Sequence, residues 1–98
     1  MEILHTEEVD ALFDAILLLE NREECYKFFE DALTVREILD IAQRLKAAKM
    51  LQSGSSYNEV CATTGMSTAT ISRVSKALER GAGGYRLILE RLGEEKND

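Results

Sequence analysis

The chain has 98 residues, of which 45% are hydrophobic and 31% are charged, and it contains no proline. This length suits one domain with a modest core and falls short of what a multi-domain enzyme needs. It holds no apolar run near the roughly 18 residues of a membrane span, and its acidic start, MEILHTEE, differs from a signal peptide. We therefore expect an ordered, all-α, cytoplasmic protein with no membrane partner.

Metal, redox and catalytic chemistry have no support in the residue pattern. Cys25 and Cys61 lie 36 positions apart, with no second cysteine or histidine near either. A CxxC redox pair and a zinc site are thereby excluded, and we expect buried thiols. His5 is the only histidine and lies near the terminus, without partners for a metal or a catalytic triad. No nucleophile is paired with a base at a defined spacing, so we expect no enzyme and no resident cofactor.

The net charge of −6 is unevenly divided along the chain. Residues 1–43 contain twelve acids and three bases, a net charge of −9, whereas residues 44–91 contain eight bases and three acids, a net charge of +5. This asymmetry indicates a basic binding face on an acidic body. The alternative is that both sets of charges are solvated helix faces.

Apolar spacing and capping residues predict about six helices and no strand. The expected bounds are about 7–20, 22–32, 35–53, 57–63, 68–80 and 85–92. The start signals are N-caps or capping boxes at Thr6, Asn21, Thr34/Glu37, Ser56/Glu59 and Ser67. We expect one domain, 1–98, consisting of core and dimerisation helices (1–54), a helix-turn-helix (55–80) and a C-terminal helix with a tail (81–98).

Two apolar patterns bear on packing. The first helix carries four apolar residues in a row, Ile16 to Leu19, which would cover about 300° of a helix at 100° per residue. A helix that is apolar nearly all round packs on two partners, one of which could be another subunit. In the third helix, the residues expected to face inward are Ile38, Ile41, Ala42, Leu45 and Ala48.

Residues 57–78, YNEVCATTGMSTATISRVSKAL, form the most informative stretch and are typical of a DNA-reading helix-turn-helix. Val60 and Cys61 should face the second helix, and Gly65 should supply a left-handed turn. In that second helix, the residues expected to anchor it to the core are Ile71, Val74 and Leu78. The opposite face would meet DNA with short hydroxyls, alanine and cations. The predicted DNA-binding residues are Ser56, Asn58, Ser67, Thr68, Ala69, Ser72, Arg73 and Lys76.

The stretch from Leu33 to Leu78 resembles the Trp repressor family. GMSTATISRVSKAL is similar to that family's Gly-x-x-x-Ala-Thr-Ile-(Thr/Ser)-Arg segment at identical spacing. Leu33-Thr34, Arg44 and Gly54 also keep the family's intervals. The whole chain looks closer still to the Trp repressor-related YerC/YecD group of Gram-positive bacteria. The resemblance implies an intertwined homodimer that presents two recognition helices to a palindromic operator in double-stranded DNA, as a regulator of transcription and most simply a repressor.

The resemblance also implies a set of ligand positions. In tryptophan-responsive members two arginines sandwich the indole, and the matching residues here are Arg44 and Arg73, with Thr34 and Thr70 beside them. The family's glycine after the second arginine borders the indole, but this chain has Val74 there. A branched side chain would take the space of the ring, which argues against tryptophan as corepressor and leaves another small molecule open.

A second class of function fits the same residues. The exposed face of the helix-turn-helix could dock a protein partner instead of DNA, and the acidic residues 1–43 support that alternative. For Arg44 and Arg73 the alternative to ligand binding is a phosphate contact or a surface ion pair.

Overall fold

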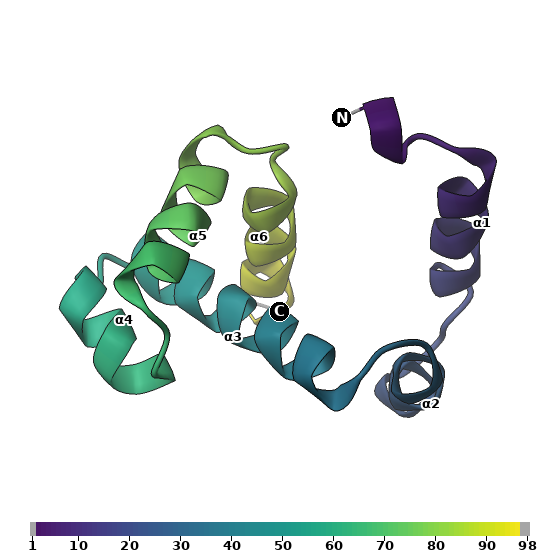
Figure 1. Cartoon of the computed structure of the whole chain (residues 1–98), viewed down its shortest axis with the longest axis horizontal. Helices are drawn as coiled ribbons and strands as arrows, with labels where there is room; N and C mark the ends of the chain where they lie inside the picture. The colour runs from purple at the N-terminus through teal and green to yellow at the C-terminus, as the bar shows by residue number, and fades with distance from the viewer. Residues whose placement is uncertain (1, 97–98) are drawn as a thin grey trace. The chain divides into compact units, whose positions relative to one another are not determined.

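The computed structural model describes residues 2–96 of the chain, with side-chain environments up to residue 94. It contains six α-helices and one short 3-10 helix, and no strand occurs within residues 2–96 (Figure 1). The predicted all-α fold is therefore confirmed. The chain forms two compact units, Met1–Ile38 and Leu39–Asp98. The predicted division into segments 1–54, 55–80 and 81–98 of a single domain remains a prediction.

The first unit contains a 3-10 helix, η1 (Glu2–Leu4), and two α-helices, α1 (Glu7–Ile16) and α2 (Arg22–Ala32). Thr6 begins α1 as predicted, because its hydroxyl accepts a hydrogen bond from the Val9 amide at 3.2 Å. An N-cap of this kind satisfies one of the amides that a first helical turn leaves without a partner.

The prediction that the first helix reaches Glu20 is wrong, since α1 ends at Ile16. The amides of Leu18 and Leu19 bond three residues back, to Ala15 and Ile16, so the chain tightens as it leaves the helix. The next helix, α2, starts at Arg22. Asn21 takes the extended conformation of an N-cap, with φ −155°, and accepts a hydrogen bond from the Glu24 amide at 2.9 Å. The cap of α2 keeps α1 from passing Glu20, while the tightened hydrogen bonds of Leu18 and Leu19 end α1 earlier, at Ile16.

Helix α3 (Val35–Gln52) begins at the predicted capping box. The Thr34 amide donates to Glu37 Oε1 at 2.9 Å, and the Glu37 amide donates to Thr34 Oγ1 at 3.1 Å. The helix ends as predicted just before Gly54, whose φ of +97° lies in the region that favours glycine.

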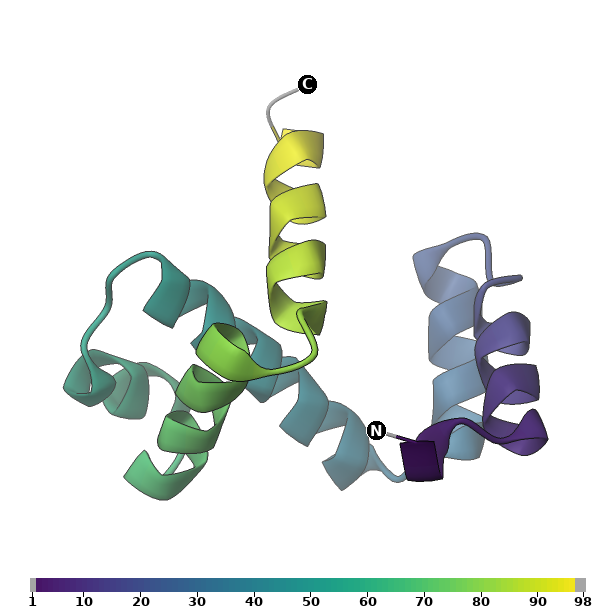
Figure 2. The ribbon, with the colours of Figure 1, turned by 90° about the horizontal axis from the view of Figure 1, so that it is seen from above.

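The second unit contains three further helices: α4 (Tyr57–Thr64), α5 (Thr68–Arg80) and α6 (Gly84–Lys96). The bounds of α5 match the prediction, whereas α6 extends beyond the predicted end at Leu92. Seen from above, α4 and α5 form a tight pair and α6 leaves the end of α5 in a direction away from α4 (Figure 2).

The core of the described chain lies in the second unit. Its buried members are Ala47, Ala48, Val60, Ile71, Val74 and Leu89. These residues come from the helices α3, α4, α5 and α6, and α3 contributes the two alanines. The predicted anchors Ile71 and Val74 are buried, and Leu78 and Cys61 pack partly buried against this core. The core covers one side of α4 and one side of α5. The opposite sides of these two helices therefore remain available for contacts with another molecule.

The first unit contains no buried residue among those described. Its large apolar side chains with most of their area exposed include Leu17 at 80% and Leu18 at 78%. Of the α3 residues expected to face inward, Ala48 is buried and two are half-buried, but Ile41 is 52% exposed and Ala42 is exposed. The thiols of Cys25 and Cys61, expected to be buried, are half-buried and free. A single copy of the chain therefore leaves much of its apolar surface uncovered.

None of the helices described within residues 2–96 is long and apolar enough to cross a membrane.

Candidate nucleic-acid interface

The turn between α4 and α5 is built from three adjacent residues. Gly65 has φ +72°, and its amide donates to the Cys61 carbonyl at 2.8 Å, which ends α4. The Thr64 hydroxyl donates to the Val60 carbonyl at 2.7 Å and accepts a hydrogen bond from the Met66 amide at 3.2 Å. The left-handed conformation predicted at Gly65 is thus confirmed, and Thr64 ties both sides of the turn together.

The two faces of α5 have opposite character, as the sequence predicted. Ile71 and Val74 point into the core, with 0% and 2% of their area exposed. One turn apart on the other face lie the five residues predicted to meet DNA: Thr68, Ala69, Ser72, Arg73 and Lys76. Ser72 is half-buried and the other four are exposed. A rigid helix that presents hydroxyls, a methyl group and two cations offers donors and acceptors for base edges and phosphates.

The first turn of α5 is preorganised by hydroxyl groups. Ser67 is its N-cap and accepts a hydrogen bond from the Thr70 amide at 3.2 Å, while the hydroxyls of Ser67 and Thr70 lie 3.0 Å apart. No acidic residue lies in this first turn. The free amides of the helix start and the positive end of its dipole are therefore not neutralised by a carboxylate.

The start of α4 differs, because its predicted capping box is complete. The Ser56 amide donates to Glu59 Oε1 at 2.9 Å, and the Glu59 amide donates to Ser56 Oγ at 3.1 Å. Hydrogen bonds from the backbone and side chain of Ser56 lower the pKa of Glu59. A carboxylate fixed at this helix start opposes a phosphate there. Ser56 and Asn58, both exposed, are better placed for neutral polar contacts.

The four predicted ligand residues are divided between the two units. Thr34 lies in the first unit, where its hydroxyl is engaged in the capping box of α3. Arg44, Thr70 and Arg73 lie in the second unit; both arginines are exposed and Thr70 is half-buried. Val74, at the position where the family glycine borders the indole, belongs to the core of this unit.

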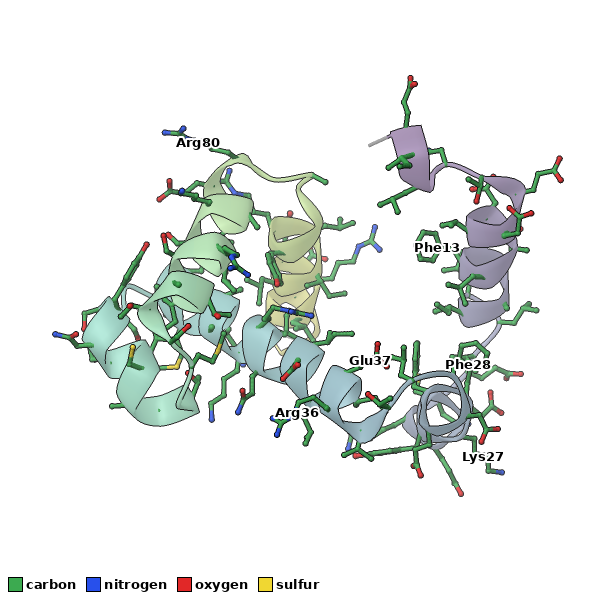
Figure 3. All side chains as sticks on the ribbon, in the orientation of Figure 1. Phe13, Lys27, Phe28, Arg36, Glu37 and Arg80 are labelled. Carbon is green, nitrogen blue, oxygen red and sulfur yellow. The ribbon has the colours of Figure 1, made fainter. Side chains whose placement is uncertain are left out.

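Sequence reasoning missed the side chains that hold the helix-turn-helix from outside. Gln43 of α3 donates to the Thr64 carbonyl at 3.2 Å, and Arg86 of α6 reaches the carbonyls at the end of α5. Local patterns give little signal for the Gln43 contact. An arginine shortly after a glycine-rich break is a weak signal for capping the preceding helix. Arg80, exposed at the end of α5, extends away from α6 (Figure 3).

The fold and this surface together define an all-α helix-turn-helix protein of the kind found among DNA-binding regulators. The family model described as Trp repressor protein matches residues 7–93, and the chain belongs to that family. The family predicted from sequence is confirmed.

Similarity to individual proteins covers nearly the whole chain. Over 95 residues the chain is 45% identical to the protein YerC of Bacillus subtilis (strain 168), covering 97% of this chain and 91% of that protein. The crystal structure of a TrpR-like protein from Eubacterium eligens ATCC 27750 matches with a TM-score of 0.92 and 47% identity, covering 95% of this chain and 96% of that one. The crystal structure of a candidate Trp repressor from Staphylococcus aureus matches with a TM-score of 0.90 and 51% identity, covering 94% of this chain and 92% of that one.

Proposed function

We propose that this protein is a sequence-specific DNA-binding regulator of transcription, acting as a repressor, that binds a palindromic operator as a homodimer. The observation that carries the proposal is the division of α5 into a buried stripe and an exposed polar stripe. Ile71 and Val74 fix the helix to the core, so its outer hydroxyls and cations are held in a defined geometry. Family membership supports the same function.

In this proposal the first turns of α5 enter the major groove, close both to base edges and to a flanking backbone phosphate. Thr68 and Ala69 are exposed near the start of α5, where short side chains allow close approach to base edges and thymine methyl groups. Arg73 and Lys76 lie further along the same face, within reach of guanine or phosphate. Because α5 starts without an acid, we place a phosphate at its N-terminus instead of at α4.

Dimerisation is supported by the apolar surface that one chain leaves uncovered. The first unit has no buried residue among those described, and a segment without a core cannot offset the conformational entropy of ordering it. A second copy of the chain would supply the missing apolar partner. Two copies would also present two α5 helices, which fits a palindrome with half-sites about one helical turn apart.

We further propose that tryptophan is not the corepressor. Val74 is 2% exposed and packs in the core beside Arg73, so its branched side chain occupies the place of the family glycine. Arg44, Arg73, Thr34 and Thr70 remain the residues that would meet a different small molecule. Isothermal titration calorimetry with tryptophan should give no binding heat, whereas saturable binding would refute this part of the proposal.

The experiment that tests the main proposal is selection from a random duplex pool at near-physiological salt. We expect enrichment of a palindrome. Arg73→Ala and Ser72→Ala should each weaken binding to that site, by about 1–3 kcal/mol where a base contact is lost. Arg22→Ala is the matched control, since Arg22 is exposed on α2 and outside the helix-turn-helix.

Equal binding by the Arg73 and Arg22 variants would refute the assignment of α5 as the reading helix. If the folded dimer enriched no site, with or without amino acids added, the protein-interaction alternative would replace the proposal.

A further inference from the structure

Arg86, a residue of α6, caps the C-terminal end of α5. Its Nε donates to the Leu78 carbonyl at 2.7 Å, and its Nη2 lies 3.4 Å from the Glu79 carbonyl. The last four carbonyls of a helix have no amide partner within the helix, so they need donors from elsewhere. A guanidinium also carries its positive charge to the negative end of the helix dipole.

The glycine-rich break between α5 and α6 makes this contact geometrically feasible. A Cβ at Gly81 would lie 2.4 Å from the Ala77 carbonyl oxygen, so no side chain fits where α5 ends. Gly83 has φ +91° and reverses the chain immediately before α6 begins at Gly84. Arg86 therefore lies in the first turn of α6, beside the carbonyls that it caps.

The second half of α5 packs against α6 but is less deeply buried than the first half. Val74 is the last buried residue of the helix, and Leu78, one turn later, is only partly buried. Lys76, on the proposed DNA-binding face, lies beyond Val74. Without a further constraint, the end of α5 would fray and its outer side chains would lose their fixed direction.

We propose that Arg86 is a positioning residue for DNA recognition, which fixes the orientation of α5 without touching DNA itself. This inference rests on the proposed DNA-binding function. Arginine suits the role because its rigid planar fork holds two donors toward two neighbouring carbonyls, whereas the donors of a lysine ammonium rotate on a flexible stem.

The test compares Arg86→Met and Arg86→Lys with the control Arg91→Met, which removes the same charge from the same helix at a position away from the end of α5. Binding to the selected palindrome and to a random duplex is measured over a range of salt concentrations. Arg86→Met should lower affinity for the palindrome by about tenfold and leave random-duplex affinity within about twofold of that of Arg91→Met. Arg86→Lys should recover part of the loss.

Two further readouts separate positioning from direct contact and from general destabilisation. The salt dependence of binding should keep its slope in Arg86→Met, because no phosphate contact is lost. Amide hydrogen exchange in the free protein should quicken over residues 78–81 and stay unchanged over residues 69–74.

Palindrome affinity equal to that of Arg91→Met would overturn the positioning role while the DNA-binding function stands. A salt slope reduced by about one would overturn it in favour of a phosphate contact. Failure of the unaltered protein to bind any selected site would instead overturn the proposed function, and with it this role.

Discussion

The side-chain amide of Gln43 donates to the backbone carbonyl of Thr64 at 3.2 Å, although the two residues lie 21 positions apart in the chain. The contact joins α3 to the last residue of α4, immediately before the turn at Gly65. Thr64 in turn bonds to both sides of that turn through its hydroxyl. The start of α5 is therefore placed relative to α3 through two hydrogen bonds that meet at Thr64.

Gln43→Ala should lower the free energy of unfolding by about 0.5–1.5 kcal/mol, the usual net value of one hydrogen bond, and toward the lower end because the contact is exposed. Gln52→Ala is the control, as Gln52 is exposed at the C-terminal end of α3. Urea unfolding followed by circular dichroism measures both. Equal stability of the two variants would show that the Gln43 contact contributes nothing.

Ser67 serves both the fold and the proposed interface, and two substitutions separate these roles. Asparagine and aspartate both cap helices as well as serine does, so Ser67→Asn and Ser67→Asp should stay within a few tenths of a kcal/mol of the unaltered protein in stability. Aspartate adds a negative charge where we place a phosphate. Ser67→Asp should therefore bind the selected palindrome more weakly than Ser67→Asn, most clearly at low salt, in a fluorescence anisotropy titration.

Equal affinity of the aspartate and asparagine variants would place the start of α5 away from the DNA backbone. Unfolding of either variant would be visible in the same circular dichroism experiment, so a folding defect cannot be mistaken for lost binding.

Leu18 is 78% exposed in one copy of the chain, directly after the end of α1. Leu18→Glu should have little effect on an isolated chain. If a second copy covers this residue, the buried carboxylate should shift the protein from dimer toward monomer in sedimentation velocity. The control is Ala62→Glu, which places the same charge on an exposed residue of α4. An unchanged dimer in both variants would place the dimer contact elsewhere.

Helix starts were readable from sequence, because each depends on hydrogen bonds within four residues. Thr6, Asn21 and Ser67 all cap as predicted, and α5 begins and ends where its spacing indicated. Ends were harder to predict: the four apolar residues after Ala15 favour more helix, but the amides of Leu18 and Leu19 bond three residues back and the chain leaves the helix. Apolar spacing does not distinguish a continuing α-helix from such a tightened last turn.

Packing across the chain was less predictable than local structure. Helical spacing marks Ile41 as apolar and inward-facing, yet it is 52% exposed in a single copy, because spacing cannot distinguish the chain's own core from a partner's. The contacts of Gln43 and Arg86 depend on how helices are placed, and polar residues at surface positions give only a weak signal of that. The division of α5 into a buried face and a largely exposed face needed only its local pattern and was predictable, while the role of the exposed face in reading DNA stays a prediction.

The two capping boxes should make stability depend on pH. Hydrogen bonds from Thr34 lower the pKa of Glu37, and hydrogen bonds from Ser56 lower that of Glu59, in each case first from the backbone amide and then from the side chain. A carboxyl with a lowered pKa in the folded state stabilises that state when ionised. The contribution is present above the unfolded pKa of about 4.3 and is lost as the pH falls through the lower, folded value.

Glutamine keeps the capping oxygen but cannot titrate in this range. The double variant Glu37→Gln/Glu59→Gln should therefore be less stable than the unaltered protein at pH 7, and the difference should shrink as the pH falls below about 4.3. Thermal unfolding from pH 7 down to pH 3 measures this convergence. Glu8→Gln/Glu23→Gln is the matched control, with both residues exposed near helix starts. A difference that stays constant with pH would show that ionisation of Glu37 and Glu59 is not what stabilises α3 and α4.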